Sequence, residues 1–105
     1  MATFTVLYTK PDNDAEAFLQ EYRDDHLAIA KKFPKMTDYT TTVFSGTPRG
    51  GEPPYYLMFV GTWESMADLQ GAMGDPSLME ASKHAMGMLA KYGNSAEMLI
   101  GDGLG

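Results

Sequence analysis

The sequence predicts an α+β domain whose elements follow in the order βαββαβ. Three observations lead to this prediction: four short segments with the composition of strands, two stretches with helical periodicity, and turn-forming residues between them. With 105 residues, the chain has the length of a single domain, residues 1–105. In this order the four strands form one antiparallel sheet, and the helices lie on one of its faces.

The first strand and the first helix occupy the N-terminal third. Residues 3–9 alternate between aromatic or aliphatic side chains and mostly threonine, which is typical of a strand. A helix is expected over residues 14–33, because Asn13 and Glu16 have the spacing of a capping box and Pro34 disfavours a helical residue before it. Its apolar stripe consists of Ala15, Phe18, Leu19, Tyr22, Ile29, Ala30 and Phe33.

The middle of the chain predicts two strands joined by a flexible loop. Residues 36–45 are rich in β-branched and aromatic side chains, whereas the Gly- and Pro-rich segment 46–54 fits neither helix nor strand. Residues 55–63 are apolar at consecutive positions, a pattern expected when both faces of a sheet are covered. Because the helices cover only one face, we expect a homodimer that packs sheet against sheet.

The C-terminal part predicts a broken helix and a last strand. A second capping box at residues 65–68 opens a short helix, and Asp75-Pro76 reads as the start of a longer one. A strand is expected over residues 96–100, and residues 102–105 have the composition of a flexible tail. The whole order is ferredoxin-like. The longer helix has an apolar face of Leu78, Ser82, Ala85, Met86, Leu89 and Tyr92 and a polar face with Glu80, His84 and Lys91.

Composition narrows the classes of partner. Fourteen acidic against eight scattered basic residues give a net charge of -6, so nucleic acid is not expected as a ligand. The absence of cysteine excludes a disulfide framework, a thiolate metal site and a cysteine nucleophile. The N-terminal segment lacks the pattern of a signal peptide and no apolar run is as long as a membrane span, which predicts a cytoplasmic protein without a membrane partner.

His26 is the leading candidate for a catalytic group, because it falls near the centre of the apolar stripe of the first helix. An imidazole among apolar side chains is mostly neutral at pH 7 and can accept a proton lying next to a carbonyl or phenol. The alternative is a core histidine held by one hydrogen bond, for instance to Tyr22. Tyr39 is the second catalytic candidate, as a donor to a developing oxyanion, and its alternative is ordinary strand packing.

Several aromatic residues are candidates for the wall of an apolar pocket between the sheet and the first helix. Core packing is the alternative for each of them. His84 is expected in solvent or at an interface, and a Glu80-x-x-x-His84 pair supplies only two ligands, so neither a metal nor a cofactor is expected. The substrate-binding candidates are Tyr8, Phe18, Tyr22 and Trp63.

Short motifs along the chain carry a resemblance to a known family. They are Tyr8-Thr9-Lys10-Pro11, Phe18, Tyr22-Arg23-Asp24-Asp25-His26, Phe33-Pro34, Tyr39, and Tyr55-Tyr56 leading to Trp63. Together they resemble the EthD family of the dimeric α+β barrel superfamily, over about residues 4–101. The family is named for proteins that accompany a cytochrome P450 system degrading ethyl tert-butyl ether.

The resemblance implies a small-molecule catabolic protein. Similar chains include methylmuconolactone isomerases, and the superfamily holds cofactor-free monooxygenases and haem-binding enzymes. His26 and Tyr39 match the isomerase-like pocket, but a mechanism that uses a thiol cannot be carried over, because position 67 is Ala67 and the chain has no cysteine. We therefore expect a cofactor-independent enzyme, isomerase- or oxygenase-like, acting on an aromatic-derived or lactone-like compound. The alternatives are a non-catalytic carrier for an oxygenase and a haem protein with His26 as axial ligand.

Overall fold

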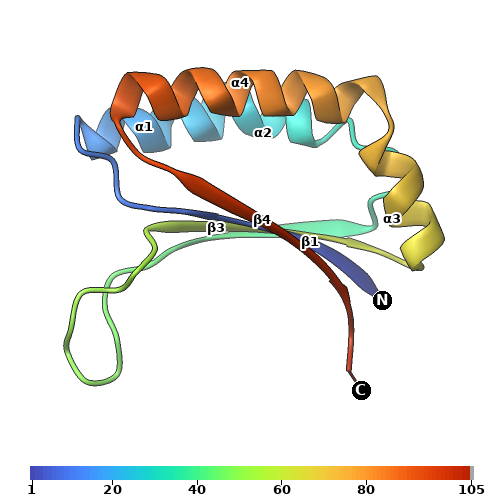
Figure 1. The fold of residues 1–105 in the computed structure, drawn as a ribbon, viewed down its shortest axis with the longest axis horizontal. Helices are drawn as coiled ribbons and strands as arrows, with labels where there is room; N and C mark the ends of the chain where they lie inside the picture. Colours follow the sequence, from blue (N-terminus) through green and yellow to red (C-terminus); the bar gives the residue numbers. More distant parts are fainter. Residues whose placement is uncertain (105) are drawn as a thin grey trace.

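The computed structural model describes residues 1–104 and confirms the predicted ferredoxin-like α+β fold, with a four-stranded antiparallel sheet and all helices on one face (Figure 1). The first helical stretch is continuous and contains one π-helical segment, here called the π-turn, in its middle. The elements are β1 (Ala2–Tyr8), α1 (Ala15–Glu21), the π-turn (Tyr22–His26), α2 (Leu27–Ala30), β2 (Asp38–Val43), β3 (Leu57–Trp63), α3 (Met66–Met73), α4 (Pro76–Tyr92) and β4 (Ala96–Asp102).

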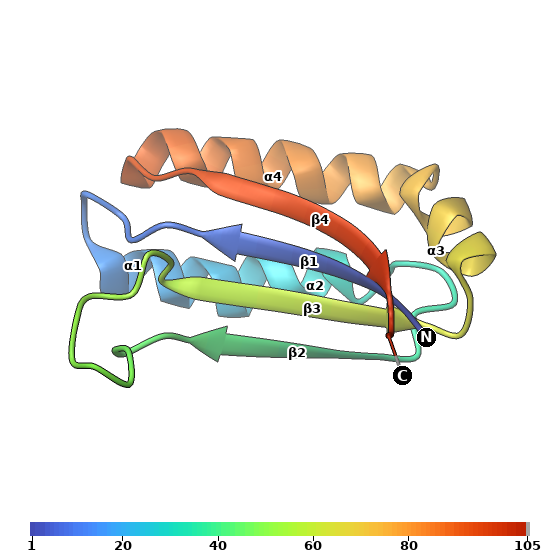
Figure 2. The same ribbon diagram turned by 60° about the horizontal axis from the view of Figure 1, so that its bottom comes forward.

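The sheet has the strand order β2-β3-β1-β4 (Figure 2). Residues opposite each other in antiparallel strands share a face, so the register fixes which side chains meet the helices. Val6 lies opposite Phe59 on β3 and opposite Met98 on β4, and all three therefore face the helices. Of these, Met98 lies in the layer between sheet and helices at an exposed edge, whereas Val6 and Phe59 are buried. The predicted alternation of the first strand is confirmed.

The first helix differs from the prediction at both ends. Asp14, in a left-handed conformation with φ of 42°, is the N-cap in place of Asn13, and its carboxylate accepts from the Ala17 N–H at 3.1 Å. The predicted end at Phe33 is wrong, because the helix ends at Ala30 and the chain continues as a turn in which the Phe33 N–H donates to the Ala30 carbonyl. The cap thus lies one residue later than the predicted capping box placed it.

The π-turn was not predicted. Its signature is the Leu27 N–H, which donates to the carbonyl of Tyr22, five residues earlier. In a regular α-helix, residues four apart are rotated by about 40° relative to each other. The wider π-turn reduces this rotation, so that Tyr22 and His26 stay on the same buried side as Phe18.

The predicted break in the second helix is confirmed. Ser65 caps α3 by accepting from the Asp68 N–H, and Asp75 caps α4, whose first residue is Pro76. Gly93 ends α4 in a left-handed conformation with φ of 69°, where a side chain would be strained. The most buried side of α4 is turned toward the first helix and consists of Ser77, Ala81, Met88 and Tyr92.

The sheet face away from the helices is bare in the single chain (Figure 1). By register it carries Leu7, Met58, Val60 and Leu99, together with threonines of β1, β2 and β3. Leu99 is about half exposed. β4 extends to Asp102, and the Gly103 N–H donates to the Met1 carbonyl, whereas Gly105, the end of the predicted tail, lies outside the described residues. None of the described helices is long and apolar enough to cross a membrane.

Candidate functional site

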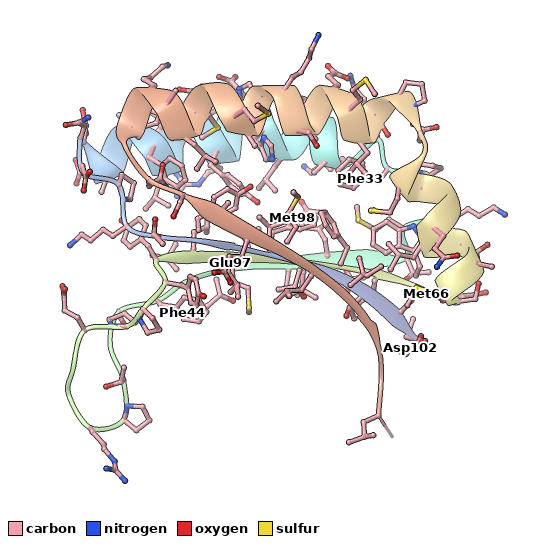
Figure 3. The ribbon with its side chains drawn as sticks, in the orientation of Figure 1. Phe33, Phe44, Met66, Glu97, Met98 and Asp102 are labelled. Carbon is pink, nitrogen blue, oxygen red and sulfur yellow. The ribbon has the colours of Figure 1, made fainter. Side chains whose placement is uncertain are left out.

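A mostly apolar cavity of about 150 Å³ lies between the sheet and the helices. Met86 of α4 and Met98 of β4 line it and are 68% and 66% exposed, so it opens to solvent along the β4 edge. Figure 3 shows Met98 and Phe33 between the two layers, both from the cavity wall. The lining residues are Phe4, Val6, Tyr8, Tyr22, His26, Ala30, Phe33, Phe59, Leu78, Ala81, Ser82, Ala85, Met86, Leu89, Ala96 and Met98.

His26 supplies the imidazole of this wall. It is 6% exposed at the end of the π-turn, and its Nδ1 lies 2.9 Å from Nδ1 of His84 on α4. The two ring planes differ by 22° and the centroids are 5.2 Å apart, so the nitrogens lie between the ring centres and the contact is edge to edge. Burial, and to a smaller extent the nearby His84, lowers the pKa of His26 from 6.5 to about 4. His26 is therefore neutral at pH 7.

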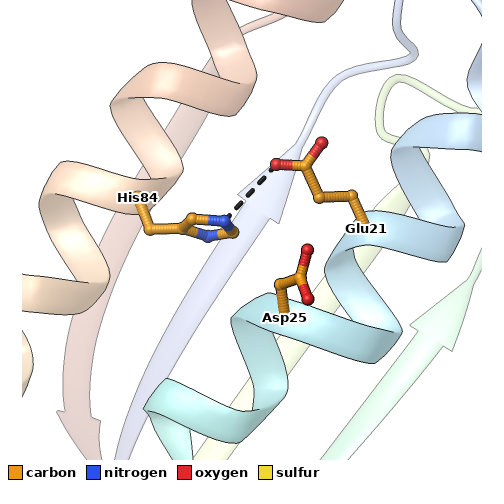
Figure 4. A group of neighbouring side chains, drawn as sticks. All are labelled: Glu21, Asp25 and His84. Carbon is orange, nitrogen blue, oxygen red and sulfur yellow. Dashed lines mark ion pairs between the residues drawn. The ribbon is translucent and has the colours of Figure 1, made fainter.

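His84 in turn faces Glu21, the last residue of α1. Its Nε2 lies 3.4 Å from Oε2 of Glu21, as the dashed line in Figure 4 shows. The other carboxylate oxygen of Glu21 accepts from Lys91 Nζ and from the Tyr92 hydroxyl, each at 2.8 Å. These two hydrogen bonds lower the pKa of Glu21, so this carboxylate is ionised at pH 7.

Tyr22 and Tyr8 add hydroxyl groups to the cavity wall. The Tyr22 hydroxyl is buried and has no hydrogen-bond partner among the described residues, although an unpaired buried hydroxyl is costly. Burial raises the pKa of Tyr22, and the Tyr8 hydroxyl next to it raises this pKa further without meeting hydrogen-bond geometry. Burial also raises the pKa of Tyr8 to about 12. Both phenols therefore keep their protons and can donate.

The structure separates the predicted site residues into two groups. His26, Tyr8 and Tyr22 line the cavity, whereas the lining does not include the other three among the described residues. Tyr39 stacks on Phe59 with ring centroids 5.9 Å apart. Phe18 is fully buried behind Tyr8 and Tyr22, and Trp63 is fully buried where its Nε1 donates to the Pro34 carbonyl at 2.8 Å.

His84, which was expected in solvent or at an interface, has a side chain that is 25% exposed and contacts His26 and Glu21 of the first helical stretch. Glu80, four residues earlier on α4, pairs instead with Lys32 at 3.4 Å. Sequence reasoning missed both His84 and Glu21 as members of the site. One signal was present: His84 falls on the same helical stripe as Ala81 and Met88, which a helix packed sideways against another helix would bury.

Glu21, Asp25 and His84 offer ligand atoms that all lie within 4.8 Å of one another (Figure 4). Two carboxylates and an imidazole suit a divalent metal ion in principle. The Lys91 ammonium, however, already neutralises Glu21 at 2.8 Å and would repel a second cation. We assign no metal to this group.

Comparisons with known proteins agree with the fold. The structure is similar to that of an EthD family protein from Bacillus halodurans, with a TM-score of 0.86, 28% identity and 99% coverage of both chains. The cofactor-independent oxygenase SnoaB from Streptomyces nogalater has a TM-score of 0.66 and 12% identity, covering 99% of this chain and 93% of SnoaB. A dimeric protein of ferredoxin-like fold from Bacteroides fragilis has a TM-score of 0.62 and 10% identity, covering 97% and 96%.

The two distant structures share the fold alone with this protein. No curated protein matches the sequence. A family model described as the EthD domain, however, matches residues 10–91, which is most of the chain. The similarity to the Bacillus halodurans protein extends over the same region. This chain belongs to the EthD family.

Proposed function

We propose that this protein binds a small, mostly apolar ring compound in the cavity and transfers a proton on it, with His26 as general acid or base. The observation that carries the proposal is a neutral, buried imidazole in the wall of an apolar cavity that opens to solvent. Such groups, shifted in pKa and placed in a cleft, are typical of acid–base catalysis. The reaction is isomerase- or oxygenase-like, and its proton transfer uses side chains of the cavity wall.

The size of the cavity limits the ligand. Apolar cavities of about 150 Å³ bind a single benzene ring, whereas pockets for drug-sized molecules are roughly 300–1,000 Å³. At about 150 Å³, this cavity fits one aromatic or lactone ring. A porphyrin is much larger than a cavity of about 150 Å³, so this cavity does not fit haem.

Two side chains of the cavity wall have different roles in the proposed reaction. His26 removes a proton next to a carbonyl or from a phenol, and negative charge then develops on the ligand oxygen. We propose Tyr22 as the donor to this oxygen, because its buried hydroxyl lacks a partner and keeps its proton. In this proposal Tyr22 takes the part that the family resemblance suggested for Tyr39, while Tyr39 supports the wall through Phe59.

The test uses α-angelica lactone, a one-ring lactone whose proton shift to the conjugated isomer changes its ultraviolet absorbance. We expect His26→Gln to lower the rate by about 10²-fold or more, and Tyr22→Phe by about 10²-fold. Tyr55→Phe is the matched control, because that hydroxyl pairs with Glu97 outside the cavity. Tyr39→Phe decides between the two tyrosines, since a loss there instead of at Tyr22 would return the role to Tyr39.

Equal rates for wild type and His26→Gln would reject the proposed chemistry. The competing function, a carrier that delivers such a compound to an oxygenase, predicts a different pattern. In that case the lactone or a phenol raises the melting temperature of the protein but is recovered unchanged. The cavity is common to both functions, so only turnover separates them.

We further propose that the bare sheet face packs against a second copy of the chain. Leu7, Met58 and Val60 lie in the middle of this face, and the charged Glu97 lies on its edge strand. These three side chains are only partly buried, and an apolar patch left open to solvent marks an interface in which a two-fold axis lets one patch cover the other. Sedimentation should therefore show a dimer that Val60→Lys dissociates and Ala90→Lys, on the exposed side of α4, does not. A monomeric wild type would contradict the interface.

A further inference from the structure

We propose that a proton taken up by His26 is passed on to His84, where Glu21 serves as its counter-ion, so that His84 and Glu21 act as a relay behind the cavity. The inference rests on the proposed function of the cavity. Neither His84 nor Glu21 lines the cavity, which makes them positioning residues and not ligand contacts.

The relay answers a physical difficulty. His26 is almost fully buried between the Tyr22 and His84 rings, whose centroids lie 5.0 and 5.2 Å from its own. A charge kept there would be poorly solvated, so an isolated His26 would be a weak base. His84 is 25% exposed and lies beside an ionised carboxylate, which makes it the better place for the charge.

The geometry also fixes which nitrogen of each ring carries a hydrogen. An ionised Glu21 only accepts, so the neutral His84 ring presents its Nε2–H to Oε2 at 3.4 Å. Its Nδ1 is then an acceptor, and the 2.9 Å contact requires His26 to donate from Nδ1. Nε2 of His26, which has no hydrogen-bond partner among the described residues, is left with its lone pair for the cavity. This is the form that a base requires.

The proton balance follows from this arrangement. A ligand C–H or O–H bond breaks, its proton goes to Nε2 of His26, and the electron pair stays on the ligand. The hydrogen on Nδ1 of His26 moves to Nδ1 of His84, which becomes an imidazolium facing Glu21. His26 ends neutral, with its hydrogen on Nε2 in place of Nδ1. The same Nε2–H can then protonate the ligand at another atom, and the reverse transfer from His84 restores the starting state.

Several charged groups surround His84 besides Glu21. Asp25 lies on the π-turn and adds a second negative charge, with its carboxylate within 4.8 Å of the other two groups. Lys91 lies about two helical turns after His84 on α4. Its positive charge, 2.8 Å from Glu21, offsets part of the negative charge near His84. The Tyr92 hydroxyl donates to the same oxygen of Glu21 as Lys91. Oε2 of Glu21 is thereby left to face His84.

The relay can be tested without any ligand by ¹⁵N NMR of the imidazole rings, because the chain has only two histidines. At about pH 8, where imidazoles are neutral, we expect the hydrogen of His26 on Nδ1. As the pH falls and the pair of histidines takes up its first proton, the hydrogen of His26 should move to Nε2 while His26 stays neutral. The proposal is overturned by a His26 hydrogen on Nε2 at high pH, or by a first proton that charges the His26 ring instead of moving its hydrogen.

Variants separate the relay from simple packing. Glu21→Gln removes the counter-ion, so the tautomer change of His26 should occur at a lower pH than in wild type. Glu80→Gln is the matched control, because Glu80 lies on the same helix as His84 but pairs with Lys32. If the tautomer change occurs at the same pH in wild type, Glu21→Gln and Glu80→Gln, Glu21 is not part of the relay. The wild-type titration keeps the proposal testable should a variant fail to fold.

Turnover of α-angelica lactone distinguishes a failed relay from a failed function. His84→Gln should lower kcat by about 10²-fold and leave KM unchanged, because His84 does not itself line the cavity. Should His84→Gln keep full kcat while His26→Gln loses it, the relay is wrong and the role of His26 stands. Should both keep it, the proposed function itself is wrong.

Discussion

The inner face of the sheet is filled at one end and hollow along one edge. At the filled end Trp63 and Leu69 are completely buried, and a Cβ added at Gly61 would lie 3.0 Å from both the Met36 sulfur and the Trp63 ring, which is closer than ordinary contact. Along the β4 edge, Met86 and Met98 line the cavity and remain about two-thirds exposed. Both regions belong to the same layer and are made of apolar side chains.

The difference lies in the kinds of side chain that each region uses. A large rigid aromatic ring against a glycine packs without voids, and such packing stabilises the fold. Alanines with flexible methionines leave space and adapt to what enters it. The predicted apolar face of α4, including Leu78 and Leu89, is thus only half buried because it forms the wall of a cavity. Stability and binding are therefore assigned to different ends of one layer.

The largest expected effect concerns the filled end. Trp63→Ala should lower the free energy of unfolding by about 3–5 kcal/mol, because it leaves a large void and removes the hydrogen bond to the Pro34 carbonyl. Urea unfolding followed by circular dichroism measures this change. A loss below about 1 kcal/mol would show that this end is not the main source of stability.

The next largest effect is a loss of stability at low pH that comes from His26 in the wall of the cavity. The pKa of His26 is lowered in the folded state to about 4, so between pH 6.5 and 4 the unfolded chain binds a proton that the folded chain does not. The free energy of unfolding should therefore decrease as the pH is lowered through this window. Relative to neutral pH, the loss is about 2 kcal/mol at pH 5 and about 3 kcal/mol at pH 4.

His26→Gln is the matched variant for this measurement, because it removes this imidazole and leaves the other titrating groups in place. The lowered pKa of Glu21 also costs stability in acid, but it does so in both proteins. The difference between their denaturation curves at each pH isolates His26. Curves that run parallel from pH 7 to 4 would contradict the burial of a neutral imidazole.

The smallest effect on stability is expected at the open edge. Met98→Ala should change the free energy of unfolding by less than about 0.5 kcal/mol, because the side chain is 66% exposed. Affinity for α-angelica lactone should fall by about fivefold, since Met98 lines the mouth of the cavity. Equilibrium denaturation and calorimetric titration on the same sample measure the two quantities. A stability loss comparable to that of Trp63→Ala would erase the distinction between the regions.

Much of the fold could be predicted from the sequence, because strands and helix breaks are set by local chemistry. The alternation of β1 and the Asp75-Pro76 start of α4 are examples, since each depends on residues a few positions apart. The inward position of His26 followed from helical periodicity in the same way. Tyr8 and Tyr22 were correctly expected to be near it, whereas Trp63 and Phe18 were indistinguishable from wall residues by composition alone.

The relay partners could not be predicted in this way. A helix that lies beside another helix on a sheet has two buried sides, and periodicity does not tell which one a polar residue joins. His84 occupies the side toward the first helix, which only the packing of α4 against the π-turn determines. The π-turn itself depends on tertiary contacts, because its sequence contains no glycine or proline to mark it.

The fully buried Trp63 is the only tryptophan of the chain. Its indole is held at the filled end by the Pro34 carbonyl and does not line the cavity. Tryptophan fluorescence should therefore report whether the chain is folded without responding to a ligand in the cavity, so unfolding can be followed by the same signal with and without ligand.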